Sequence, residues 1–161
     1  MVHIRELLSK LSSTGVDYVI VGGAAASLHG STLYTDDLDV CCPMTEDNMA
    51  RLIDALDPLN PVLRDPRKIP LPRKPSLLAQ CRTLLLVTDL GKFDVLKEIT
   101  GIGDYDSVRA RTITMDIEGR PTRVLDIDAL IIAKRAAGRT KDMLGVMHLE
   151  AVKARRAKDL K

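Results

Sequence analysis

Tyr18-Val-Ile-Val-Gly-Gly-Ala-Ala-Ala-Ser27, followed by Thr35-Asp-Asp-Leu-Asp-Val40, is the part of this sequence that decides the fold. Successive side chains of a strand point to opposite faces, so Asp37 and Asp39 are predicted to project together. At 4 Å and an effective dielectric of about 20, two such charges repel by roughly 4 kcal/mol. The pair therefore needs a shared proton or a cation. Because oxygen ligands beside a phosphate favour magnesium, the stretch predicts a metal–phosphate site.

A third carboxylate stands in the apolar stretch Lys92-Phe-Asp-Val95, where Asp94 faces away from its apolar neighbours. If this strand lies beside the one that carries Asp37 and Asp39, three acids converge. Such a cluster can hold two divalent metals about 3.5–4 Å apart for in-line displacement at phosphorus. A surface position in a hairpin is the competing interpretation of Asp94. Asp89, Asp104 and Asp106 are alternative acids.

The spacing of apolar residues, glycines and prolines predicts an alternation of helices and strands. We expect helices at Ile4–Leu11, Ala24–His29, Glu46–Leu56, Ala129–Ala137 and from about Lys141 onward, and strands at Val16–Val21, Asp37–Cys42, Arg82–Thr88, Lys92–Leu96, Arg111–Ile117 and Pro121–Leu125. The last four strands form two hairpins. The stretch 57–75 holds six prolines and five basic residues, so it is expected to be a loop crossing one edge of the sheet.

These elements predict an α/β (α+β) fold, a small mixed sheet flanked by helices. Residues 1–161 are expected to form a single domain with a helical C-terminal part from about 127. The composition is 45% hydrophobic but only 2% aromatic, so the core must be aliphatic and base stacking on single-stranded nucleic acid is disfavoured. The three cysteines are interpreted as reduced thiols. The sequence contains neither a signal peptide nor the run of about 18 apolar residues that a membrane span requires. We expect a cytoplasmic protein without membrane contact.

The order of these motifs resembles the polymerase-beta-like nucleotidyltransferase superfamily. The glycine pair after an apolar strand, the Asp37-x-Asp39 pair and the later Asp94 carry the resemblance. The tail, with Leu125–Lys134 followed by Gly138–Asp142, is similar to the minimal bacterial branch that includes AbiEii-type toxins. The resemblance runs from about residue 16 to residue 149 and implies a nucleotidyltransferase-like fold.

The resemblance also implies an activity. A nucleoside monophosphate would pass from a nucleoside triphosphate to a hydroxyl of an RNA, a protein or a small molecule, with release of pyrophosphate at a two-metal Mg²⁺ site. Asp37 and Asp39 would bind both ions, and Asp94 would complete the acceptor-side ion and help deprotonate the attacking hydroxyl. The expected nucleotide-binding residues are Gly22, Gly23, Ser27, Lys134, Arg139 and Lys141. A toxin of a toxin–antitoxin pair, with an antitoxin partner, fits the same resemblance. Because the short chain leaves little material for a base-specificity domain, we expect a partner or a homodimer to supply one.

The sequence departs from the superfamily pattern at two positions. Many members have Gly-Ser where this chain has Gly22-Gly23, and Ser27 and Ser31 are the candidate substitutes for the serine hydroxyl. Tyr34 stands where relatives often carry Arg. The alternative interpretation is therefore a non-catalytic module that keeps the fold and binds a nucleotide, RNA or a partner protein.

Two basic stretches are candidates for contact with RNA phosphates, with plain solvated charge as the alternative. They are the proline-rich segment with Arg64, Arg67, Lys68, Arg73 and Lys74, and the tail with Lys153, Arg155, Arg156, Lys158 and Lys161.

Overall fold

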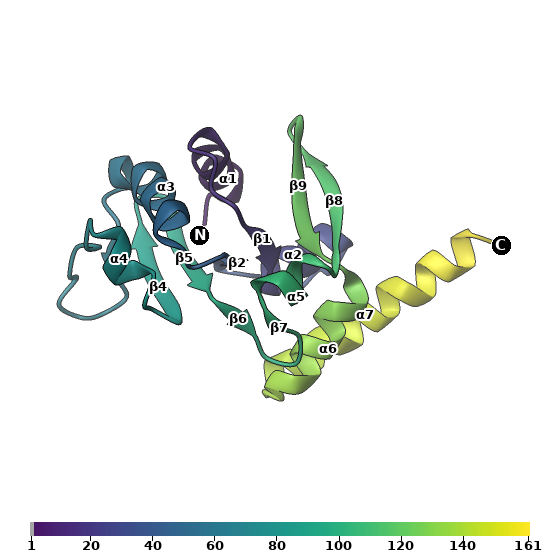
Figure 1. Ribbon diagram of the computed structural model, residues 1–161. Coiled ribbons are helices and arrows are strands. Elements are labelled where there is room, and N and C mark those ends of the chain that lie inside the picture. The colour runs from purple at the N-terminus through teal and green to yellow at the C-terminus, as the bar shows by residue number, and fades with distance from the viewer. Residues whose placement is uncertain (1) are drawn as a thin grey trace.

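A mixed sheet of seven strands forms the centre of the computed structural model, which describes residues 2–161 (Figure 1). Its strand order is β3-β4-β5-β2-β1-β9-β8, and a separate two-stranded sheet pairs β6 with β7. The strands are β1 (Val19–Val21), β2 (Asp37–Cys41), β3 (Val62–Leu63), β4 (Thr83–Thr88), β5 (Gly91–Leu96), β6 (Glu98–Ile99), β7 (Gly103–Asp104), β8 (Thr112–Ile117) and β9 (Arg120–Leu125).

The helices surround this sheet. They are α1 (Ile4–Ser13), α2 (Gly22–His29), α3 (Glu46–Leu56), the short 3-10 helix η1 (Asp57–Leu59), α4 (Pro75–Leu78), α5 (Tyr105–Arg109), α6 (Ile127–Ala137) and α7 (Thr140–Asp159). In Figure 1, α1 and α3 lie at the top, whereas α6 and α7 lie at the bottom and α7 extends outward to the C-terminus. The predicted architecture, a mixed sheet flanked by helices, is confirmed.

Two parallel pairs make the sheet mixed. β2 runs parallel to β5, and β1 runs parallel to β9, while the remaining neighbours are antiparallel. The β2–β5 register places Asp39 opposite Asp94 and Leu38 opposite Phe93. Leu38 and Phe93 are fully buried, whereas the two aspartates share the other face.

The helix boundaries follow local capping chemistry. The Thr45 side chain accepts a hydrogen bond from the Asn48 N–H at 3.2 Å at the start of α3. Asp126 caps α6 by accepting from the Ala129 N–H at 2.6 Å, and Gly138 ends that helix with a φ of 68°. These caps fix where α6 begins and turns into α7.

The proline-rich stretch is more ordered than the sequence indicates. It begins with η1, contains the edge strand β3 and ends as α4 begins at Pro75. The segment 97–110 also differs, because β6, β7 and α5 occupy a region where neither a helix nor a strand was predicted. Short elements of two to five residues carry too little periodicity to be recognised in a sequence.

A mainly aliphatic core joins residues from Leu7 to Leu149, while the single domain stays a prediction. Its members include Leu7 and Leu11 of α1, and Phe93 is the largest side chain among the fully buried ones. Cys41 and Cys42 are buried and unpaired. Within residues 2–161, none of the helices has the length and apolar character that crossing a bilayer requires.

Candidate active site

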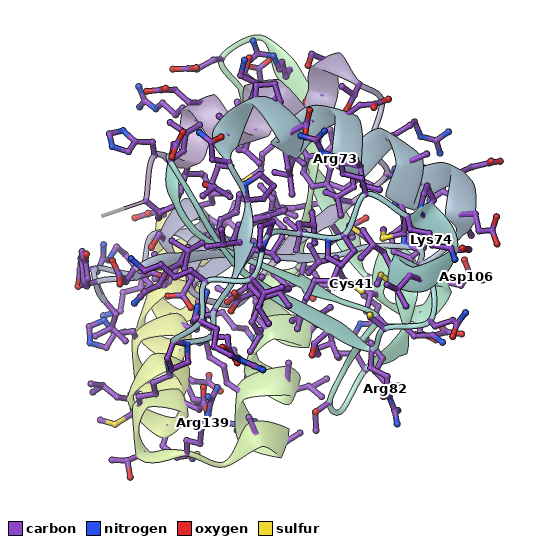
Figure 2. The ribbon with its side chains drawn as sticks, turned by 90° about the vertical axis from the view of Figure 1, so that its left-hand side faces the viewer. Cys41, Arg73, Lys74, Arg82, Asp106 and Arg139 are labelled. Atoms are coloured by element: carbon purple, nitrogen blue, oxygen red, sulfur yellow. The ribbon has the colours of Figure 1, made fainter. Side chains whose placement is uncertain are left out.

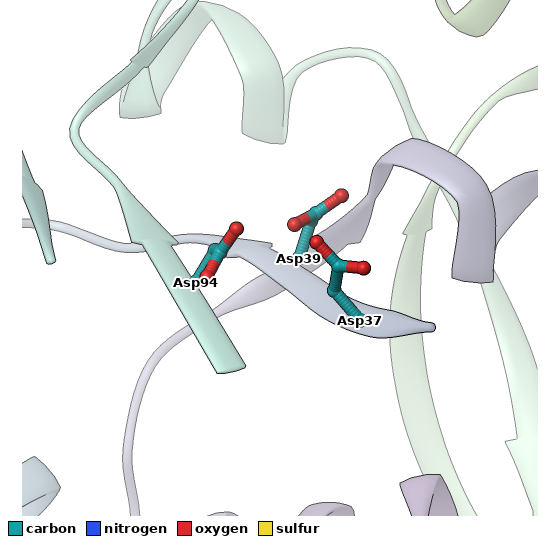
Figure 3. Close-up of side chains that lie close together, drawn as sticks. All are labelled: Asp37, Asp39 and Asp94. Carbon is teal, nitrogen blue, oxygen red and sulfur yellow. The ribbon is translucent and has the colours of Figure 1, made fainter. Parts of the chain in front are cut away.

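Three carboxylates meet on one face of the sheet. Asp37 and Asp39 project from β2, and Asp94 projects beside them from β5 (Figure 3). One oxygen of each lies within 4.8 Å of the others, a spacing that allows shared cations. The sequence-based expectation that these three acids converge is confirmed, while their chemical roles stay predictions.

The close approach changes the acidity of the cluster. Burial, followed by the charges of Asp94 and Asp37, raises the pKa of Asp39 from 3.8 to about 7. Burial also raises the pKa of Asp94, although the neighbouring Arg64 guanidinium opposes that shift. Without a metal ion, Asp39 therefore keeps its proton to a higher pH than an ordinary aspartate does. A group of hard oxygen ligands with excess negative charge fits Mg²⁺.

The N-terminus of α2 faces these acids. Val21 of β1 pairs with Asp39, so the chain turns into α2 directly beside the carboxylate. A Cβ atom at Gly22 would lie 2.3 Å from Asp39 Oδ2, and the φ of +62° also excludes most side chains. No side chain caps α2, so its first N–H groups are available to an anion.

Gly23 is also constrained by its surroundings. Its Cβ atom would lie 2.7 Å from Thr35 Oγ1, so the threonine hydroxyl occupies the space that a side chain at position 23 would need. No local sequence signal marks Thr35, because its contact with Gly23 is non-local. Ser31 lines the same cavity as Thr35, whereas Ser27 is exposed on α2 and does not line it.

A cavity of about 790 Å³ opens between the sheet, α2 and the α6–α7 pair. Its lining brings together most of the predicted site residues, namely Gly22, Gly23, Asp37, Asp39, Lys134, Arg139 and Lys141. Ser27 and Asp94 are the two that do not line it. Asp94 is buried beside Asp39, with 7% of its surface exposed.

The cationic side of the cavity comes from α6 and α7. Burial lowers the pKa of Lys134, whose side chain lies across Gly145, where a Cβ would meet Nζ at 3.1 Å. Arg139 donates to both oxygens of Asp142, at 2.6 and 3.3 Å. Burial alone would raise the pKa of Asp142, but these hydrogen bonds and the nearby cationic charges lower it. Asp142 thus orients Arg139 at the cavity wall.

The basic residues of the proline-rich segment have different surroundings. In Figure 2, Arg73 and Lys74 lie far from Arg139, on another side of the molecule. Arg73 forms an ion pair with Asp57. Arg64, in contrast, reaches the acid cluster and donates to both oxygens of Asp94, at 2.5 and 3.4 Å. Sequence reasoning missed this contact because it joins residues thirty positions apart across two strand pairings.

The family of the chain follows from comparison with known proteins. The family described as "Nucleotidyltransferase of unknown function (DUF6036)" matches residues 1–154. The chain belongs to this nucleotidyltransferase family. No curated protein matches the chain closely enough to count as a relative. The predicted activity class, an enzyme that transfers nucleotides, is confirmed at this level, whereas the placement in the AbiEii-type branch stays a prediction.

Solved structures of other nucleotidyltransferases share the fold. A putative nucleotidyltransferase from Thermotoga maritima is similar with a TM-score of 0.55 and 15% identity, over 100% of this chain and 97% of that one. ANT(2″)-Ia, in complex with adenylyl-2″-tobramycin, gives a TM-score of 0.59 and 18% identity over 96% and 93% of the two chains. A nucleotidyltransferase-like protein from Paracoccidioides brasiliensis gives 0.54 and 21%, over 91% and 73%. At these identities the likeness concerns the fold alone.

Proposed function

We propose that this nucleotidyltransferase transfers a nucleoside monophosphate from a nucleoside triphosphate to an acceptor hydroxyl, using Mg²⁺ held by Asp37, Asp39 and Asp94. The observation that carries the proposal is the meeting of three carboxylates beside the uncapped N-terminus of α2. When bound there, two Mg²⁺ ions would polarise the α-phosphate and lower the pKa of the attacking hydroxyl.

The protein's own groups account for the binding of the triphosphate. The free N–H groups at the start of α2 face the space beside Asp39, so the β- and γ-phosphates fit there. Lys134, Arg139 and Lys141 approach the same cavity from the opposite wall and offset the remaining negative charge. The hydroxyl of Thr35, next to Gly23, adds a polar group at this end of the helix.

The reaction itself is an in-line displacement. The acceptor oxygen forms a bond to the α-phosphorus, and the bond from that phosphorus to the oxygen bridging to the β-phosphate breaks, so pyrophosphate leaves. Asp94 lies on the side of the cluster away from α2 and the cationic wall, which suits it to take the proton of the attacking hydroxyl.

For the acceptor we propose an RNA or protein hydroxyl, in the manner of a toxin from a toxin–antitoxin pair, within the cytoplasm. The resemblance of the C-terminal stretch to AbiEii-type toxins supports this choice. ANT(2″)-Ia, whose structure contains an adenylylated aminoglycoside, makes a small-molecule hydroxyl the second acceptor class to assay. An antitoxin partner or a second copy of the chain stays a prediction.

The test is transfer of label from each of the four α-labelled nucleoside triphosphates to total RNA, to protein and to an aminoglycoside, with Mg²⁺. We expect Asp37→Ala to abolish transfer while the far-ultraviolet circular dichroism spectrum and melting temperature stay close to those of the wild type. Asp54→Ala, which removes an exposed carboxylate on α3, is the matched control and should transfer normally. Equal transfer by Asp37→Ala would show that the assigned metal ligand is wrong. Binding of nucleotide without transfer to any acceptor would favour the non-catalytic alternative.

A further inference from the structure

Arg64 lies in line with paired residues of β4, β5 and β2 that lead across the sheet to the acid cluster. Its backbone N–H donates to the Leu85 carbonyl at 2.8 Å, immediately after β3. Leu85 pairs with Asp94, and Asp94 pairs with Asp39. Since directly opposite residues share a face of a sheet, Arg64 projects toward the same side as the acids.

The guanidinium is fixed against the cluster by several contacts. Nη2 donates to Asp94 Oδ1 at 2.5 Å and to the Leu86 carbonyl at 3.2 Å, while Nη1 donates to Asp94 Oδ2 at 3.4 Å. Nη1 also lies 3.9 Å from Asp37 Oδ2. The side chain of Arg64 is only 30% exposed and that of Asp94 only 11%, so solvent screens this pair weakly.

Asp94 consequently has its two carboxylate oxygens engaged by a guanidinium that also approaches Asp37. A divalent ion that bridges Asp94 and Asp37 would face that fixed positive charge at close range. An arginine cannot lose its charge by deprotonation in a protein, so one of the two cations has to yield.

We propose that Arg64 is the resident cation of the three-acid cluster and competes with the divalent ion for Asp94 and Asp37. The proposal rests on the metal site proposed above. It assigns to Arg64 the role of setting how tightly that site holds metal, so that the free protein binds divalent ions weakly.

The backbone around Arg64 is held independently of this contact. The Leu63 N–H donates to the Ile69 carbonyl at 2.7 Å, and the Leu71 N–H donates to the Pro61 carbonyl at 2.9 Å. β3 also pairs with β4. Entry of a metal therefore needs only a rotation of the Arg64 side chain, while the edge of the sheet stays in place.

The experiment is a calorimetric titration of the metal-free, full-length protein with Mn²⁺, which takes the same oxygen ligands as Mg²⁺. We expect Arg64→Ala and Arg64→Met to bind Mn²⁺ about tenfold more tightly than the wild type, a gain of about 1.4 kcal/mol. The methionine variant keeps an apolar stem of similar length, so it covers the case in which the alanine variant packs poorly. Arg67→Ala is the matched control, because Arg67 lies in the same segment and pairs with Asp65.

Thermal unfolding gives a second readout without any substrate. In a chelator both Arg64 variants should melt below the wild type, because their three acids lose a counter-charge. Saturating Mn²⁺ should then raise their melting temperatures by more than it raises that of the wild type. Unchanged or weaker Mn²⁺ binding in both variants would overturn the proposal and make Arg64 a support for Asp94.

Asp37→Ala in the same titration separates this proposal from the proposed function. If Asp37→Ala binds Mn²⁺ as the wild type does, the metal site itself is misplaced. If it loses binding while neither Arg64 variant gains any, the metal site stands and only the competition by Arg64 is refuted.

Discussion

Replacing Asp39 by asparagine should stabilise the metal-free protein at alkaline pH. In the folded state the pKa of Asp39 is raised from 3.8 to about 7, first by burial and then by the charges of Asp94 and Asp37. Between these values the folded protein binds more protons than the unfolded chain, so its stability falls as the pH rises through the window. This loss of stability is nearly complete about one pH unit above the folded-state pKa of about 7, and Asp39→Asn removes it.

The expected magnitude follows from the part of that window that an experiment can cover. The interval from pH 5.5 to the folded-state pKa of about 7 spans about 1.5 pH units. At about 1.36 kcal/mol per unit, the free energy of unfolding changes by about 2 kcal/mol over this interval. In a chelator, the advantage of Asp39→Asn over the wild type in free energy of unfolding should therefore grow by about 2 kcal/mol between pH 5.5 and pH 8.5.

Urea unfolding of both proteins at the two pH values measures this difference. Asp54→Asn, which replaces an exposed carboxylate on α3, is the control. Its free energy of unfolding should match that of the wild type at both pH values. Mg²⁺ should stabilise only the wild type and so narrow the gap at pH 8.5. A difference between Asp39→Asn and the wild type that does not change with pH would refute the view that Asp39 is held under electrostatic stress.

Two further substitutions, Gly22→Ala and Lys134→Met, test other parts of the site, and each has a control variant. Gly22→Ala should cost more than about 2 kcal/mol of stability and abolish transfer, because its Cβ would meet Asp39 Oδ2 at 2.3 Å. Gly119→Ala has a similar φ, +79°, but open space, so thermal unfolding should show only the backbone cost of about 1 kcal/mol. Lys134→Met should raise the KM for the nucleoside triphosphate at least tenfold, because it removes a half-buried charge from the cavity wall. Lys158→Met, at the exposed end of α7, should leave that KM unchanged in the same steady-state assay.

Local patterns were sufficient to predict the long elements and the two-acid strand. Alternation of apolar and polar residues defined β2, and the spacing of apolar residues defined α3. The convergence of Asp94 with the pair on β2 required one inference, that two apolar strands far apart in the sequence are neighbours. Parallel pairing of β2 with β5 makes these two strands neighbours.

Contacts that depend on three-dimensional packing could not be predicted in this way. The 57–75 stretch reads as a loop because of its prolines, yet β3 within it brings Arg64 to the acids through pairing with β4. Thr35 fills the space at Gly23 only because β2 lies beside the start of α2. Ser27 has the hydroxyl that phosphate binding needs, but its position on α2 leaves it exposed to solvent.

The geometry of the acid cluster is enforced by the core on the opposite face of the sheet. Leu38, Val40, Phe93 and Val95 are all fully buried, and they alternate with the acids along β2 and β5. A slip of β5 by one residue would place Asp94 in the core and expose Phe93, at a cost of several kcal/mol in lost apolar burial and charge desolvation. The favourable burial of one face therefore offsets the repulsion among three carboxylates on the other. A sheet held in register by its core can keep like charges together in the absence of a ligand, which is what a preformed cation site requires.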